Sequence, residues 1–124
     1  MAGIRAFSPG PTGGYAQAVE VSGASRMVFV SGQTAEAADG SLPEGFAAQC
    51  RAAWTNVEAR LAAAGLTLDH LVNVTVFLAD PAFAAENRVV RGEVLGKRTP
   101  ALTVVSARLL DPAWLVEINA VAMA

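Results

Sequence analysis

The spacing of apolar residues changes along the chain, and this change limits the possible folds more than any other feature. Between Pro43 and Gly65 apolar side chains recur every three or four residues, which predicts an amphipathic helix. The next segment, 71–78, is predicted to be a strand of alternating side chains, apolar on both faces, so we expect both faces to be covered. A second helix is predicted to begin with Asp80 as its cap and to end at Gly96.

Four further segments have the pattern of strands. They are residues 15–21, 25–31, 101–107 and 115–123, and a short strand nearer the N-terminus is also possible. The order is strand, strand, helix, strand, helix, strand, strand. This order predicts an α+β fold in which two helices pack on one face of a mixed sheet.

Turn-forming residues separate these elements. Residues 8–14, rich in proline and glycine, predict an N-terminal loop. Ser41 and Glu44 have the spacing of a helix-capping box, although Gly45 weakens that interpretation. The 124 residues contain no linker and no internal repeat, so residues 1–124 are predicted to form a single domain.

The composition is rich in apolar residues and poor in charge. Hydrophobic residues make up 53% of the chain and charged residues 16%, and the mean hydropathy is +0.40. No apolar run approaches the roughly 20 residues that span a bilayer, so we expect no membrane partner. The excess apolar surface instead predicts self-association.

Several other classes of partner and location are disfavoured. A net charge of −2 without a basic stripe argues against nucleic acid. The single cysteine, Cys50, and the single histidine, His70, exclude an internal disulfide and a metal cluster built on these residue types. The first residues lack the apolar core of a signal peptide, which predicts a cytoplasmic protein.

Glu117 is the most informative candidate for chemistry. It lies within a predicted strand whose neighbours are apolar. A carboxylate in such a place costs free energy unless it is paired or faces a cleft. Two interpretations remain open, a structural ion pair and an acid–base group that orients or deprotonates a water molecule.

Three weaker candidates are polar residues at strand ends and on a helix. Asn87 lies on the apolar stripe of the second helix, where it bonds a loop or positions a polar ligand. Ser31 and Gly32 form a turn or a place where the backbone approaches a ligand closely. Tyr15 follows two glycines and either packs or borders a site.

Other reactive residue types have structural interpretations. Cys50 is expected to be a small buried apolar residue rather than a nucleophile. His70 is expected at the boundary of a strand. Arg88 and Arg91, three residues apart, are typical of a solvated helix face.

Several short segments occur together in the order and spacing of one protein family, over nearly the whole chain. They are Gly13-Gly14-Tyr15-Ala16-Gln17, Val30-Ser31-Gly32-Gln33, Ala63-Ala64-Gly65-Leu66, Asn73-Val74-Thr75-Val76-Phe77-Leu78-Ala79-Asp80, Phe83 with Asn87, Pro100-Ala101 and Val116-Glu117-Ile118. In these segments the chain resembles the RidA family, also called the YjgF or endoribonuclease L-PSP family.

The resemblance implies a chorismate-mutase-like α+β fold and a homotrimer whose sheets form a central barrel. Small-molecule ligands would bind in clefts between the subunits. Active members of the family hydrolyse reactive imines and enamines, which form when dehydratases act on amino acids such as serine or threonine. The products are a keto acid and ammonia, and no metal or organic cofactor is needed.

The resemblance also assigns residues to the cleft. By position, the residues that would line it are Tyr15, Ser31, Gly32, Asn87 and Glu117. Glu117 would hold the water molecule that attacks the imine carbon.

One departure from the family concerns how the substrate is held. Active deaminases carry an arginine two residues after the proline, which binds the substrate carboxylate through two parallel contacts, and this chain has Leu102 there. In the family a cysteine often stands two residues after this arginine, and this chain has Val104 at that position. Thr103, between Leu102 and Val104, keeps a hydroxyl. Arg98 and Arg108 lie nearby in sequence, but the sequence places neither in the cleft.

The leading hypothesis is therefore a trimeric imine/enamine hydrolase (deaminase) that acts weakly on carboxylate-bearing imines such as 2-aminoacrylate. A related hydrolysis of a less acidic imine is the alternative enzymatic hypothesis. A ligand-binding or chaperone-like trimer without catalysis is the second class. Endoribonuclease activity is the third, and the acidic balance of charge argues against it.

Overall fold

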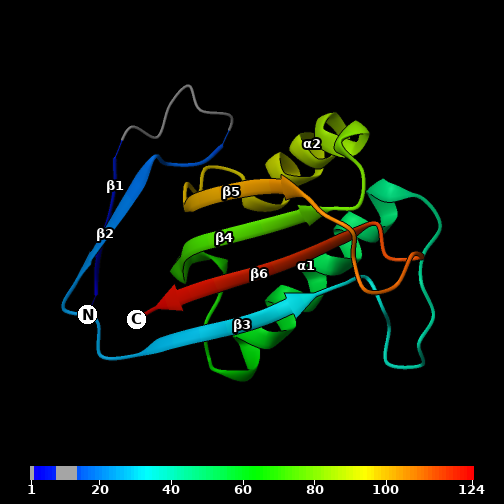
Figure 1. Cartoon of the computed structure of the whole chain (residues 1–124). Helices are drawn as coiled ribbons and strands as arrows, with labels where there is room; N and C mark the ends of the chain where they lie inside the picture. Colours follow the sequence, from blue (N-terminus) through cyan, green and yellow to red (C-terminus); the bar gives the residue numbers. More distant parts are fainter. Residues whose placement is uncertain (1, 8–13) are drawn as a thin grey trace.

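The computed structural model describes residues 2–7 and 14–124. Residues 8–13 of the predicted N-terminal loop lie outside the described residues. The first two strands, β1 (Gly3–Phe7) and β2 (Ala18–Ser22), form an antiparallel ribbon. This ribbon lies beside one end of the main sheet, where the C-terminus also lies (Figure 1).

The main sheet has four strands and mixed direction. They are β3 (Met27–Gln33), β4 (Leu71–Leu78), β5 (Ala101–Ser106) and β6 (Val116–Met123). Their order in space is β3-β6-β4-β5. β6 pairs antiparallel with β3 and with β4, whereas β4 and β5 are parallel because α2 connects them.

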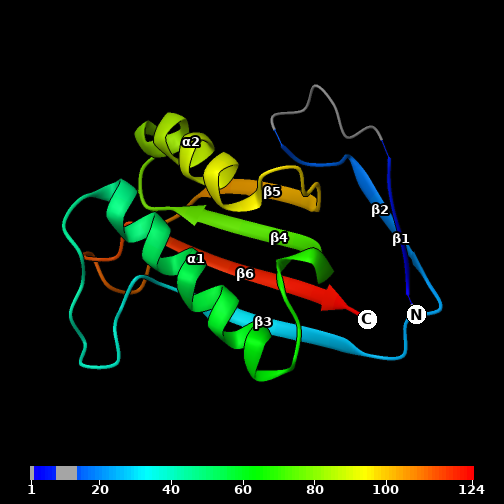
Figure 2. The ribbon, with the colours of Figure 1, turned by 180° about the vertical axis from the view of Figure 1, so that it is seen from behind.

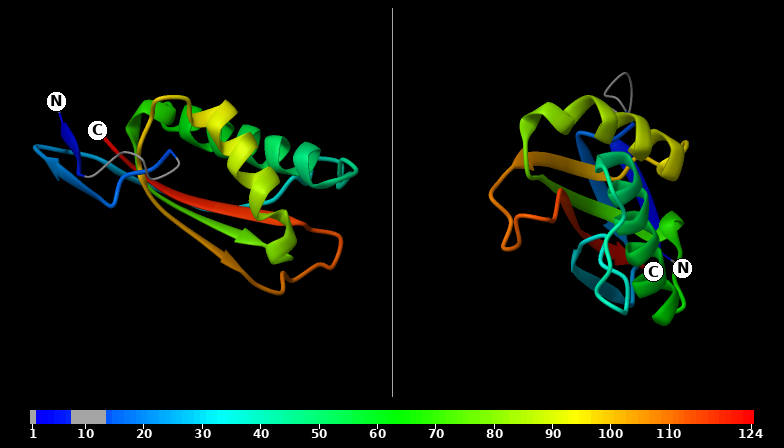
Figure 3. Two further views of the ribbon diagram at one scale, coloured as in Figure 1. Left: turned by 90° about the horizontal axis from the view of Figure 1, so that it is seen from above. Right: turned by 90° about the vertical axis from the view of Figure 1, so that its right-hand side faces the viewer.

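Both helices lie on the same face of this sheet (Figures 2 and 3). They are α1 (Phe46–Ala63) and α2 (Ala84–Leu95). The apolar stripe of α1 buries Trp54, Val57 and Leu61 completely against the sheet. The predicted α+β class and the placement of the two helices are therefore confirmed.

The expected cover on both faces of residues 71–78 is wrong for the single chain. Val74 and Val76 of β4 are fully buried on the helix side. On the other side Thr75 and Phe77 are only partly buried and Asn73 is exposed, because none of the described elements lies over that face. The sheet therefore leaves one face open.

The predicted capping box at Ser41 and Glu44 is also wrong. The Ser41 hydroxyl donates to Asp39 Oδ1 at 2.7 Å within a turn, and α1 begins only after Gly45, without a side-chain cap. The Asp80 cap is confirmed, since its carboxylate accepts a backbone N–H two residues on at 2.8 Å. It caps a short 3₁₀ turn that leads into α2.

Two irregular features of the strands position the candidate site residues. Ala16 forms a bridge with Ala101 and its N–H donates to Pro100 O at 3.0 Å, which places the chain next to β5. The pairing of β3 with β6 shifts between Val30 and Gln33. This irregularity contains Ser31 and Gly32.

Candidate functional site

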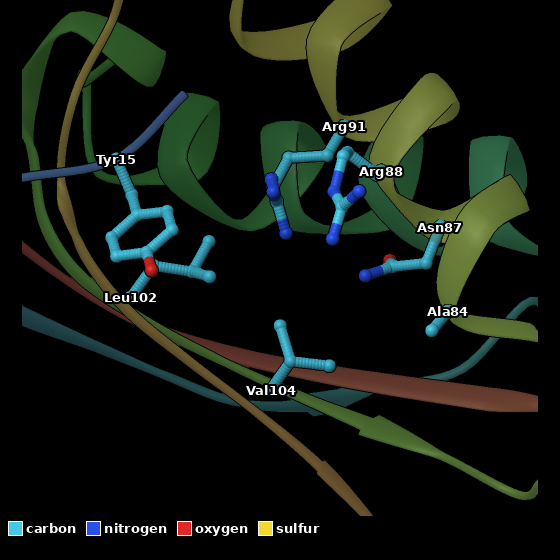
Figure 4. A pocket seen from close by; sticks show the side chains of 7 residues that line it. All are labelled: Tyr15, Ala84, Asn87, Arg88, Arg91, Leu102 and Val104. Atoms are coloured by element: carbon cyan, nitrogen blue, oxygen red, sulfur yellow. The ribbon is translucent and has the colours of Figure 1, made fainter. Parts of the chain in front are cut away.

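A cavity of about 270 Å³ lies between α2 and β5 (Figure 4). It brings together four of the residues predicted for the site, Tyr15, Asn87, Leu102 and Val104, with three more from α2, Ala84, Arg88 and Arg91. Leu102 and Val104 pair with Val74 and Val76, whose side chains face the helices. The strand alternation therefore directs both side chains toward α2.

Asn87 is held by α1 rather than by a loop. Its side chain is 1% exposed, and Cys50 Sγ donates to its Oδ1 at 3.8 Å. This contact occupies the amide oxygen, and the amide nitrogen points toward the cavity (Figure 4). Asn87 therefore presents a hydrogen-bond donor to a ligand.

Cys50 is buried completely, as the sequence predicts. Burial raises the pKa of its thiol to about 12. The thiol is therefore protonated at neutral pH, which leaves it as a hydrogen-bond donor to Asn87 and not as a nucleophile.

The prediction of a solvated face holds for Arg88, which is exposed, but is wrong for Arg91. Both guanidinium groups project from α2 into the cavity (Figure 4), and Arg91 is only 4% exposed. Its guanidinium carbon lies 5.8 Å from the centre of the Tyr15 ring, a cation–π distance. The sequence carries a signal for this position, because Arg91 follows Asn87 by four residues and shares its helix face.

A second group of predicted residues gathers around Glu117. An added Cβ at Gly32 would lie 2.2 Å from Glu117 Oε2, so the carboxylate lies directly against the glycine backbone. Ser31 immediately precedes this contact and is exposed. In the described ranges the ion pairs are Arg51–Glu93 and Arg98–Asp69, so no described cation pairs with Glu117.

The two groups lie on opposite faces of the sheet within one chain. Glu117 pairs with Phe77 and faces the open side, away from α1 and α2. Thr103 faces that open side as well, because it lies between Leu102 and Val104 in the strand alternation. Within one chain, a single small ligand therefore does not reach both groups.

The other two arginines near β5 lie elsewhere. Arg98 Nε donates to Asp69 at 2.7 Å. Arg108 borders a separate hollow with Trp114. Neither lines the cavity that contains Leu102.

Two further properties bear on partners. None of the helices in the described ranges is long and apolar enough to cross a membrane. In that same part of the chain, no group of three or more His, Cys, Asp or Glu residues is arranged to hold a metal ion.

Known proteins are similar to this chain in fold and in sequence. The sequence model of the endoribonuclease L-PSP family matches residues 6–124. A bovine 2-iminobutanoate/2-iminopropanoate deaminase is 35% identical over 121 residues, which cover 95% of this chain and 85% of the relative.

Two solved structures are similar over most of the chain. YyfB of Yersinia pestis, a Rid family protein of unknown function, has a TM-score of 0.85 at 25% identity and covers 98% of both chains. TdcF of Escherichia coli with bound serine has a TM-score of 0.75 at 31% identity, and the match covers 94% of this chain and 92% of TdcF. The chain therefore belongs to the RidA family, also called the YjgF or endoribonuclease L-PSP family.

Proposed function

We propose that this protein hydrolyses imines or enamines in small-molecule clefts between the subunits of a homotrimer. The observation that carries the proposal is the environment of Glu117. Its carboxylate lies against the backbone of Gly32, in a strand of buried apolar residues, without a partner cation in the described part of the chain. This environment favours the acid–base interpretation over a structural ion pair.

The proposed chemistry needs one activated water molecule. Glu117 accepts a proton from water while the water oxygen bonds to the imine carbon and the C=N electron pair moves to nitrogen, which takes up a proton. The resulting carbinolamine loses ammonia when its C–N bond breaks and its hydroxyl becomes a carbonyl. The backbone at Gly32 lies beside Glu117, and Ser31 is the adjacent residue in the chain, so both are placed to provide polar contacts for these groups.

Assembly is proposed from the open face of the sheet. Phe29 is 70% exposed and Met27 is 53% exposed there, and Val105 on β5 is exposed too. Large apolar side chains gathered on one face are typical of a contact surface. We propose that in this trimer Glu117 of one subunit lies near the cavity of its neighbour, so that one cleft is built from both groups.

Leu102 limits the proposed activity on the smallest acidic substrates. The bovine relative is named a deaminase of 2-iminobutanoate and 2-iminopropanoate, and TdcF contains serine, so small amino-acid-derived ligands are the best candidates. A leucine cannot form the two-pronged contact of an arginine with a carboxylate. We therefore propose slow hydrolysis of 2-aminoacrylate.

The test generates imines in the presence of the protein and measures ammonia and keto-acid release. A dehydratase supplies 2-aminoacrylate, and an amino-acid oxidase supplies larger imines. The protein is expected to accelerate release from at least one imine, and Glu117→Gln is expected to abolish this while leaving the sedimentation mass unchanged.

The alternative class, a ligand-binding module without catalysis, predicts a different result. It predicts binding of small ligands with no acceleration of any imine. The same outcome, or full activity in Glu117→Gln, would refute the proposed hydrolysis.

A further inference from the structure

The cavity that lacks the family arginine on β5 has two arginines on its opposite wall. Arg88 and Arg91 are three residues apart on α2, so their side chains leave the helix on the same side. Both guanidinium groups point into the cavity, across from Leu102 and Val104 (Figure 4). The cation that is absent from the strand is therefore present on the helix.

Two positive charges face this cavity. The described residues that line it are Tyr, Ala, Asn, two Arg, Leu and Val, and none of these is a carboxylate. Burial lowers the pKa of Arg91, and the like charge of Arg88 lowers it further. Both effects mean that an anion in the cavity would stabilise the protonated form of Arg91.

The remaining walls suit a small organic body. Leu102 and Val104 form an apolar floor, and the Tyr15 ring forms a side wall. The Asn87 amide nitrogen adds one donor, because Cys50 occupies the amide oxygen. A volume of about 270 Å³ lies just below the range of about 300–1,000 Å³ for small-molecule sites, so the occupant is a small metabolite.

We propose that Arg91, assisted by Arg88, binds the carboxylate of a small organic acid in this cavity. The inference rests on the proposed function for the location of the ligand, and it adds the chemical group that the ligand carries. Guanidinium groups match the planar geometry of a carboxylate, and the apolar floor contacts the rest of the ligand.

This arrangement is compatible with slow turnover of 2-aminoacrylate. In that molecule the carboxylate is bonded directly to the carbon that water attacks. A cation on α2 in place of β5 therefore displaces that carbon as well as the carboxylate. Binding of carboxylates and efficient hydrolysis of the smallest one are separate properties of the cleft.

The experiment measures binding, so that it does not depend on turnover. Isothermal titration or ligand-observed NMR compares butanoate with butanamide, a neutral molecule of nearly the same shape. The native protein is expected to bind butanoate at least about tenfold more tightly. Arg91→Gln is expected to remove that preference, and Arg88→Gln to reduce it.

Arg108→Gln is the matched control, since it removes one exposed arginine that borders a different hollow. It is expected to leave the preference unchanged. If Arg91→Gln fails to fold by circular dichroism, Arg88→Gln carries the test, because Arg88 is exposed.

Equal affinity of the native protein for butanoate and butanamide would overturn the inference. So would a preference that survives both substitutions on α2. A protein that binds butanoate through Arg91 but accelerates no imine would refute the proposed hydrolysis and leave the carboxylate site standing.

Discussion

Replacing Gly32 with alanine tests the catalytic role of Glu117 through a steric effect. The backbone of Gly32 does not have the positive φ that favours glycine, so the glycine is required for space. An added Cβ would lie 2.2 Å from Glu117 Oε2 and 2.7 Å from Cδ. The carboxylate would therefore have to move by roughly 1 Å to reach van der Waals distance, and its side chain is free to rotate.

The expected cost falls on the reaction and not on the fold. A displacement of about 1 Å at a reacting group reduces rates by on the order of 100-fold. The free energy of unfolding is expected to change by about 1 kcal/mol or less, since the obstacle is the end of a flexible side chain. The activity of Gly32→Ala should therefore fall toward that of Glu117→Gln, while its melting temperature stays close to that of the native protein.

The assay is ammonia release from the imine that the native protein hydrolyses fastest, with thermal unfolding measured in parallel. Gly92→Ala is the matched control, because an added Cβ there meets no atom within 4 Å. It lies inside α2, where alanine stabilises a helix relative to glycine by about 0.5–1 kcal/mol. Native activity in Gly32→Ala would refute the role assigned to the Glu117 carboxylate.

Three further predictions address selectivity, assembly and thiol chemistry. Leu102→Arg is expected to accelerate ammonia release from 2-aminoacrylate by roughly thirty-fold, equivalent to about 2 kcal/mol for a carboxylate contact. The absence of any gain would contradict the explanation based on the missing arginine. Phe29→Asp is expected to lower the sedimentation mass below that of a trimer. Val89 is 62% exposed on α2, and Val89→Asp is expected to leave the mass unchanged. A native mass for Phe29→Asp, or a monomer mass for the native protein, would contradict the proposed assembly. Cys50 is expected to resist thiol reagents at pH 8, because burial raises its pKa to about 12. The contribution of this thiol to the free energy of unfolding should fall only above pH 9, where the thiol of the unfolded chain ionises. Rapid labelling of the folded protein would refute this prediction.

The element order was predictable because it depends on local patterns. The stripe that includes Trp54 and Leu61 has a helical period, and the strand 71–78 is bounded as predicted. The beginning of α1 was not predictable from Ser41, because Asp39 offers that hydroxyl a nearer acceptor. Such a competition between local partners depends on how the turn folds.

The candidate residues were found from the sequence, but their grouping was not. Gly32 and Glu117 meet because β3 and β6 are neighbours, although the two strands are far apart in the chain. Tyr15 joins Asn87 because a bridge places Ala16 next to β5. These neighbours follow from the pairing of distant strands, which no local pattern encodes.

Arg91 shows most clearly where the sequence and the tertiary structure each decide an outcome. Its spacing from Asn87 determines which side of the helix it occupies, and the sequence alone establishes that. Whether that side meets solvent or a cavity depends on how α2 sits over β5, and on the small gap that Leu102 and Val104 leave beneath it. Local sequence thus set the elements, the apolar stripes and the candidate residues, whereas only tertiary packing decided which side chains share a cavity, because that depends on contacts between segments distant in the chain.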